Sequence, residues 1–150
     1  MRNTVVVDTS IVIKWVIDEP DSAIAVALVM KWFNEGTQIL APALLAYEVT
    51  NVLHQRVRKG SITADEAEQT LTYLLEEALV LEFTQDATLS VRAMQLARLY
   101  GLPAAYDPHF LALAERKKCD YWTADSRLLN TIGGKLPWVR RLSDYQNLLH

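Results

Sequence analysis

The sequence has few of the residues that build covalent, metal-bound or fibrous structures: one cysteine, three histidines, five glycines and five prolines in 150 residues. A lone cysteine excludes an internal disulfide and a cysteine-rich metal site, so we interpret Cys119 as a small, partly buried apolar side chain. The histidines His54, His109 and His150 lack the spacing of zinc ligands. The low glycine and proline content excludes low-complexity and fibrous material.

Long apolar segments are missing as well. The longest uninterrupted apolar run, residues 23–30, has eight residues, whereas a membrane span needs about 20. The first three residues lead directly into the β-branched segment 4–7, so we expect no signal peptide. These absences predict a protein that has no membrane partner and resides in the reducing environment of the cytoplasm.

Positive charge is not in excess, because 18 acidic residues against 15 basic ones give a net charge of −3. Proteins that passively coat nucleic acids are usually basic, so the charge balance argues against that class. An apolar fraction of 51% and a charged fraction of 22% are typical of a globular chain. At this length, residues 1–150 are expected to form a single domain.

Short apolar segments alternate with helical segments along the chain. We predict strands at 4–7, 38–40, 80–83, 121–123 and 138–142, and helices at 11–17, 22–34, 43–59, 64–79, 86–100, 105–118 and 127–131. This alternation predicts an α/β fold, a three-layer α/β/α sandwich around a central, mainly parallel sheet. In such folds, sites form at the carboxyl ends of the strands.

Glu48 is a carboxylate within an apolar helical stripe. At 100° per residue, Leu45, Glu48 and Val52 fall on one face of the helix predicted at 43–59. A buried glutamate is rare unless something compensates its charge. The alternative, a glutamate at the edge of the stripe that reaches water or pairs with an arginine, stays open.

Three aspartates stand where strands end or helices begin. Asp8 follows the first strand, Asp125 follows the fourth, and Asp107 begins the helix predicted at 105–118, with Pro108 after it. Each is also a good helix N-cap, which is the structural alternative. Four acidic groups that converged without a counter-charge would repel one another. A hard cation, Mg²⁺ or Mn²⁺, removes that repulsion, and carboxylate-bound magnesium points to phosphodiester chemistry.

The segments that carry these four acids resemble those of a known family. The PIN domains, and among them the VapC-type toxic ribonucleases of toxin–antitoxin pairs, are similar to it at residues 5–10 (VVVDTS), 47–53 (YEVTNVL), 106–116 (YDPHFLALAER) and 122–125 (WTAD). The resemblance implies a divalent-metal-dependent endoribonuclease that hydrolyses RNA. It also implies that four residues are the catalytic groups and metal ligands, with Mg²⁺ or Mn²⁺ as cofactor: Asp8, Glu48, Asp107 and Asp125.

The same resemblance assigns supporting roles and partners. Ser10 and Thr123 would sit beside the metal-binding acids, and Asn51, one turn after Glu48, would orient that glutamate. Family members form homodimers and bind a cognate antitoxin protein through their two early helices, which here carry Trp15 and Trp32. For these tryptophans, as for Trp122 and Trp138, we favour core or interface packing over base stacking.

Basic residues must hold RNA against an acidic site. We expect Lys14 and Arg56 to bind the substrate, with Arg58, Lys59, Arg116 and Lys117 as further candidates, and ordinary surface charge as the alternative. Setting the four proposed ligands aside leaves 14 acidic residues against 15 basic ones, so the negative charge of the chain would be concentrated in one pocket. His109 is rotated about 200° from Asp107 on the helix, which favours a surface or interface role.

Two alternatives remain open. The family commonly has a small residue after the third acid, where this chain has Pro108, so a catalytically weak PIN-like protein-binding module is the first. The second is an aspartyl-phosphate phosphatase that starts at Asp8. That chemistry needs a second aspartate two residues after the nucleophile, and Ser10 occupies that position.

Overall fold

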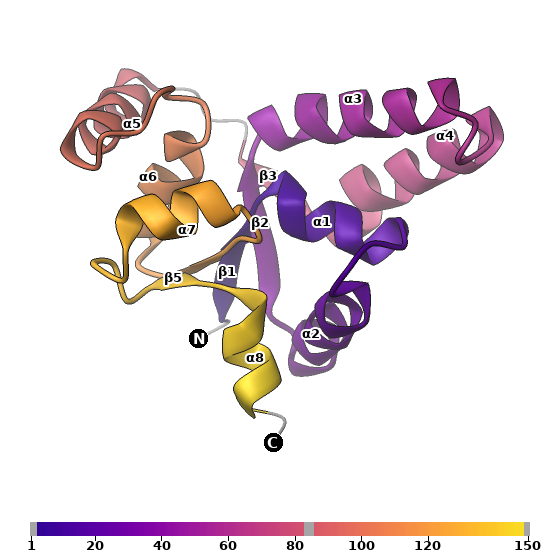
Figure 1. Cartoon of the computed structure of the whole chain (residues 1–150), viewed down its shortest axis with the longest axis horizontal. Helices are drawn as coiled ribbons and strands as arrows, with labels where there is room; N and C mark the ends of the chain where they lie inside the picture. Colours follow the sequence, from indigo (N-terminus) through magenta and orange to yellow (C-terminus); the bar gives the residue numbers. More distant parts are fainter. Residues whose placement is uncertain (1–2, 83–85, 149–150) are drawn as a thin grey trace.

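Five parallel strands form the centre of the molecule in a computed structural model that describes residues 3–82 and 86–148 (Figure 1). The spatial order is β3-β2-β1-β4-β5, and each neighbouring pair is parallel. The strands are β1 (Thr4–Val7), β2 (Gln38–Pro42), β3 (Val80–Glu82), β4 (Asp120–Trp122) and β5 (Val139–Arg140). Val5, Val6 and Val7 are all buried, as expected for a strand covered on both faces.

Helices cover both faces of this sheet and complete the predicted three-layer α/β/α sandwich (Figure 1). α6 packs across β1, β2 and β4, and α5 packs against α6. α2 packs against α1 and α8, and α3 packs against α1 and α4. The helices are α1 (Thr9–Val16), α2 (Ser22–Glu35), α3 (Leu44–Arg58), α4 (Ala64–Tyr73), α5 (Ala87–Leu99), α6 (Pro108–Lys117), α7 (Ser126–Ile132) and α8 (Leu142–Leu148), with a π-helical turn, η1 (Leu74–Ala78), after α4.

The order of the strands determines where a site can form. The chain runs from β1 outward to β2 and β3, and then returns to β4 and β5 on the other side of β1. Since such crossovers are right-handed, the helices that connect β1 to β3 and those that connect β3 to β5 lie on opposite faces. The chain adds strands on one side of β1 first and on the other side, beginning with β4, afterwards. The carboxyl ends of β1 and β4 therefore flank the topological switch point, where ligands bind in open α/β sheets.

Most of the predicted elements are confirmed, with differences at their ends. The strand predicted at 38–40 extends to Pro42, and the helix predicted at 105–118 begins only at Pro108. The helix predicted at 64–79 is regular to Tyr73 and continues as the π-helical turn. The strand predicted at 80–83 is confirmed for Val80–Glu82, and Phe83 lies outside the described residues.

The prediction for residues 138–142 is wrong at its end. Only Val139–Arg140 is a strand, and Leu142 begins α8, which the sequence pattern does not predict. The backbone N–H of Arg141 donates to the Asp144 carboxylate at 2.9 Å, and Leu142 and Tyr145 are buried. This short helix therefore forms because it covers the core, where its two apolar side chains are removed from water.

Three of the four tryptophans pack together. The ring centroids of Trp15 and Trp32 are 6.5 Å apart, and those of Trp32 and Trp122 are 5.9 Å apart. Trp32 and Trp122 are buried, which confirms core packing for these two. Cys119 is half-buried, as predicted, and burial raises the pKa of its thiol to about 11. Within the described part of the chain, no helix is long and apolar enough to cross a membrane.

Candidate active site

Asp8 lies at the switch point, directly after β1, and its carboxylate is enclosed by donors. Oδ1 accepts hydrogen bonds from the Ser10 hydroxyl and, at 3.4 Å, from the backbone N–H of Ile11. Oδ2 accepts from the Tyr121 hydroxyl at 2.6 Å and from the Thr123 hydroxyl. The N-cap interpretation of Asp8 is thus confirmed, and three hydroxyl groups hold the same carboxylate in addition.

The charge of Asp8 is poorly solvated. Only 6% of the residue is exposed, and this burial raises the pKa of the carboxyl. The hydroxyls of Ser10, Thr123 and Tyr121 oppose the shift because they stabilise the ionised form, while the negative charge of Asp107 adds to it. A buried carboxylate beside a second carboxylate is a group that a bound cation would stabilise.

Glu48 comes from the first half of α3 and is half-buried. Its Oε1 accepts a hydrogen bond from the Thr9 hydroxyl at 3.1 Å, across from the first turn of α1. Burial, together with the charges of Asp107 and Asp8, raises the pKa of Glu48 to about 7, against the effect of the Thr9 hydroxyl. The partner of Glu48 is therefore a threonine, and the alternative of an arginine partner is wrong.

Asp107 stands just before α6 and makes no capping hydrogen bond with its side chain. Asp107 thus occupies the predicted N-cap position of α6, but its carboxylate does not bond to the backbone of the helix. Burial raises the pKa of Asp107, and the nearby charge of Asp125 raises it further. Pro108 is buried at the first position of α6, with Asp107 in ordinary helical backbone geometry. The proline thus fits the first turn of the helix, and the Asp107 carboxylate remains available.

Asp125 follows β4 and does cap a helix. Its Oδ1 accepts from the backbone N–H groups of Arg127 at 3.0 Å and Leu128 at 3.3 Å, at the start of α7. The Thr123 hydroxyl in turn accepts from the backbone N–H of Asp125 at 3.0 Å. Thr123 therefore links Asp8 to Asp125, and the structure confirms that the segment after β4 places these groups together.

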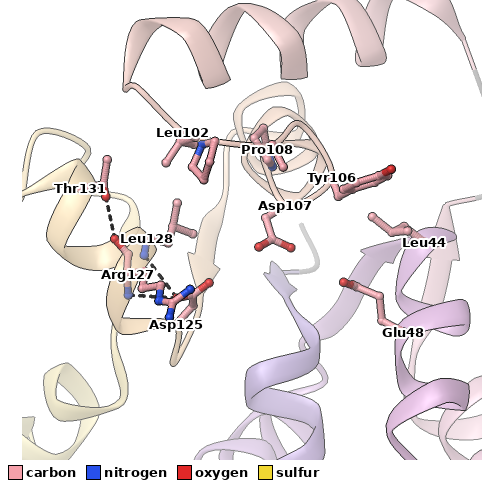
Figure 2. A pocket seen from close by; sticks show the side chains of 12 residues that line it. Leu44, Glu48, Leu102, Tyr106, Asp107, Pro108, Asp125, Arg127, Leu128 and Thr131 are labelled. Atoms are coloured by element: carbon pink, nitrogen blue, oxygen red, sulfur yellow. Dashed lines mark hydrogen bonds between the residues drawn. The ribbon is translucent and has the colours of Figure 1, made fainter.

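Three of the four acids line one cavity of about 510 Å³. Figure 2 shows Glu48 and Asp107 pointing toward the same opening from α3 and from the start of α6, with Asp125 on the α7 side. Arg127 is the one basic residue among the described residues that line this cavity. The rest of the wall consists of Tyr106, Thr131 and six apolar residues: Leu44, Leu102, Pro103, Ala104, Pro108 and Leu128.

The donor set fits a hard divalent cation in chemistry but is not assembled around one. Within residues 3–82 and 86–148, no three acidic, histidine or cysteine side chains are arranged closely enough to hold a metal ion. The charges of Asp8, Glu48 and Asp107 nevertheless act on one another, and Asp125 acts on Asp107. Carboxylate oxygens are the donors that hard divalent cations prefer, and a bound divalent cation would offset the repulsion between these acids.

Two other predicted groups lie differently from the expectation. Lys14 Nζ lies 3.6 Å from Glu19 Oε1, and Arg56 lies 3.0 Å from Glu19 Oε2, so both basic residues share one carboxylate. Asn51 is exposed, and its Oδ1 accepts from the Gln55 side chain at 3.5 Å. The expected contact of Asn51 with Glu48 is absent from the described structure.

His109 is engaged away from Asp107. Its Nδ1 lies 2.7 Å from the carbonyl oxygen of Ala105, and its Nε2 lies 3.0 Å from the Ser90 hydroxyl. Arg116 and Lys117 pair with Asp86 and Glu82 at 2.9 and 3.7 Å. These contacts agree with a structural role for His109 and with the alternative of paired surface charge for the two basic residues.

Sequence reasoning missed Thr9, Tyr121 and Arg127. Thr9 and Tyr121 reach their acids across element boundaries, from α1 to α3 and from β4 to the end of β1. The one available signal for Tyr121 was its polar hydroxyl in a short apolar strand, since a buried tyrosine hydroxyl needs a partner. Arg127 could have been found from its position two residues after Asp125, at the start of a helix.

The sequence itself matches a model of the PIN domain over residues 5–134. The chain belongs to the PIN domain family. PIN domains are typically metal-dependent nucleases that use divalent ions, which agrees with the acid-lined cavity. No curated protein matches the sequence.

Two solved structures share the PIN fold with this chain. PAE2754 from Pyrobaculum aerophilum is 22% identical, with a TM-score of 0.67, and the match covers 96% of this chain and 94% of that one. FitAcB from Neisseria gonorrhoeae is 14% identical, with a TM-score of 0.51, and the match covers 85% of this chain and 91% of that one. At these identities the likeness confirms the three-layer fold.

Proposed function

We propose that residues 1–150 form a single PIN domain that hydrolyses RNA phosphodiester bonds as a divalent-metal-dependent endoribonuclease. The observation that carries this proposal is the gathering of four carboxylates from four segments at the switch point of the sheet. Three of them, Glu48, Asp107 and Asp125, line one cavity, and Asp8 is buried beside them with a raised pKa.

In this proposal Asp8, Glu48, Asp107 and Asp125 hold Mg²⁺ or Mn²⁺. When bound, the ion supplies a water molecule of lowered pKa and neutralises negative charge that develops on the phosphate. The protein groups around the acids orient them. Ser10, Thr123 and Tyr121 hold the Asp8 carboxylate, and Thr9 holds Glu48. Such supporting hydrogen bonds fix the direction in which a ligand presents its oxygen.

Positive groups would bring RNA to this negative cavity. Arg127 lines the cavity itself, so it is the first candidate for a phosphate contact. Lys14 and Arg56 remain proposed substrate-binding groups, although each pairs with Glu19 in the free protein. These pairs are partly buried, with side-chain exposures of 15% to 32%, so a phosphate would have to displace Glu19 to reach either basic group.

We further propose that the protein is the VapC-type toxin of a type II toxin–antitoxin pair and acts in the cytoplasm as a homodimer with a cognate antitoxin. The support is the resemblance at the four acid-bearing segments and an exposed apolar side of α2. Val26, Met30 and Phe33 are 39%, 50% and 41% exposed and lie on neighbouring turns of that helix. An exposed apolar stripe of this kind is typical of a helix that meets a protein partner.

The second candidate function is a catalytically weak PIN-like module that binds protein. It is favoured by one observation, namely that the acids of the described residues are not assembled into a metal-holding group. Metal binding and RNA cleavage separate the two candidates.

The test is cleavage of single-stranded RNA by the purified full chain in Mn²⁺, in Mg²⁺ and in EDTA. Asp107→Asn is the informative variant, because the Asp107 side chain caps no helix and its loss should leave the fold intact. Asp65→Asn, on the exposed first turn of α4, is the matched control. We expect cleavage by the native protein and the control in either metal, none in EDTA, and a loss of at least about 100-fold in Asp107→Asn. Unchanged cleavage by Asp107→Asn, or no cleavage of any RNA without metal binding, contradicts the proposal.

A further inference from the structure

Two exposed tyrosines flank the acid-lined cavity. Tyr47 immediately precedes Glu48 and is 73% exposed, and Tyr106 immediately precedes Asp107 and is 70% exposed. Within the described residues, neither hydroxyl makes a hydrogen bond and neither ring packs on another aromatic ring. Rings this exposed contribute little to folding, so packing does not explain their presence beside the acids.

The two tyrosines line a second cavity, of about 200 Å³. Leu44 and Tyr106 line both cavities, so the two spaces adjoin at this pair. Figure 2 shows Tyr106 next to Leu44, on the side of the opening where Glu48 lies. At about 200 Å³ the second cavity is smaller than the usual 300–1,000 Å³ of small-molecule sites, which suits one planar ring system.

The second cavity also differs in charge from the first. Among the described residues that line it, the one acidic residue, Asp86, pairs with Arg116 at 2.9 Å, so that negative charge is compensated. Ser90 and His109 add polar groups to the wall, joined by a contact of 3.0 Å. The Nδ1 of His109 donates to the carbonyl oxygen of Ala105, since a carbonyl can only accept, and the Nε2 contacts the Ser90 hydroxyl. The Ser90 oxygen keeps lone pairs that accept from a ligand.

We propose that this second cavity binds one nucleobase of a single-stranded RNA, the base next to the phosphate that lies in the acid-lined cavity. Tyr106 and Tyr47 provide the stacking surfaces, and Ser90 provides an acceptor for the edge of the base. The inference rests on the proposed nuclease function and adds the position and chemistry of a base-binding subsite. Aromatic rings beside a phosphate site are the usual way in which proteins hold unpaired bases.

The test uses an RNA oligonucleotide whose cleavage position in native protein is mapped, and matched oligonucleotides that carry an abasic ribose on either side of that position. Native protein, Tyr106→Ala, Tyr106→Phe and Tyr47→Ala are compared for kcat and KM. Tyr73→Ala is the control, because Tyr73 is an exposed tyrosine of α4 that lies outside both cavities.

We expect Tyr106→Ala to lower kcat/KM by about 5- to 150-fold, the factor that stacking of one base provides. Tyr106→Phe should stay near the native value, since stacking needs the ring and not the hydroxyl. An abasic ribose at one of the two positions should lower the native kcat/KM similarly. The abasic RNA that slows native protein should be cleaved at the same rate by native protein and by Tyr106→Ala, because the missing base and the missing ring belong to one contact. Tyr73→Ala should match the native protein throughout.

The results distinguish a failure of the proposed base subsite from a failure of the proposed nuclease function. If native protein cleaves RNA but neither the tyrosine variants nor the abasic substrates change kcat/KM, the base subsite is overturned and the nuclease function stands. If Tyr106→Ala is slow on intact and abasic RNA alike, the ring acts on the acids and not on a base, which also overturns the inference. If native protein neither binds nor cleaves any oligonucleotide, both the inference and the proposed function fail.

Discussion

The Tyr121 hydroxyl donates a 2.6 Å hydrogen bond to Oδ2 of Asp8, and both residues are buried. The bond joins two neighbouring parallel strands, because Val6 of β1 pairs with Tyr121 of β4 and Asp8 follows β1 by one residue. Burial raises the pKa of the Tyr121 hydroxyl well above its usual value, so this group remains a donor at neutral pH. A strand of the core thereby fixes the direction of a carboxylate in the candidate site.

Tyr121→Phe tests this relationship. The variant removes the hydroxyl and keeps the ring in the core, so it should cost about 1.5–3 kcal/mol of unfolding free energy, the value of a hydrogen bond to a charged group. It should also raise the pKa of Asp8 further and weaken Mn²⁺ binding. Urea unfolding and Mn²⁺ titration measure the two effects, with Tyr73→Phe as an exposed control. Native stability and native Mn²⁺ affinity in Tyr121→Phe would show that the bond does not support the site.

Glu48→Gln should flatten the dependence of stability on pH. The folded pKa of Glu48 is about 7 against an ordinary value of 4.5, so the folded state holds this proton more tightly than the unfolded chain. The resulting stability is present below pH 4.5 and is lost as the pH rises through about 7. In EDTA, the Tm of the native protein should therefore fall more between pH 5 and pH 8 than the Tm of Glu48→Gln. Parallel Tm curves would refute the raised pKa.

Arg127→Ala should weaken RNA binding without changing the fold. Arg127 is exposed and lines the acid-lined cavity (Figure 2), where a phosphate contact would add affinity that depends on salt. We expect a higher KM, a smaller change in kcat, and a reduction of about one in the slope of log K against log salt. Arg98→Ala, an exposed arginine on α5, is the control. Equal slopes of log K against log salt for Arg127→Ala and Arg98→Ala would show that Arg127 does not contact the RNA phosphates.

Much of the fold could be predicted from local pattern. The run of β-branched residues predicts the strand β1. Gly36 adopts a left-handed backbone and ends α2, as a glycine after a helix predicts. α8 could not be predicted in this way, because Leu142 and Tyr145 form a helix only where the core receives them. Local preference is weak in such short segments, and tertiary packing decides.

The candidate site, like the fold, could be predicted only in part from local pattern. Glu48 was found because a carboxylate interrupts an apolar stripe, and Asp8 because it ends a buried strand. Thr9 and Tyr121 were missed because their contacts join residues 39 and 113 positions apart in the chain. Lys14 and Arg56 were predicted from their charge, and for Lys14 also from its position one helical turn after Ser10. Neither signal reveals that Glu19 pairs with both of them.

The central claim is that the acids at the switch point form a divalent-cation site, and titration of Mn²⁺ into the protein by calorimetry at pH 8 tests it most directly. The native chain is compared with the double variant Glu48→Gln/Asp107→Asn and with Asp65→Asn/Glu76→Gln, a control that removes two exposed acids. We predict saturable Mn²⁺ binding to the native protein and the control, and its loss in the double variant. Equal binding by all three proteins, or no binding by any of them, would contradict the account.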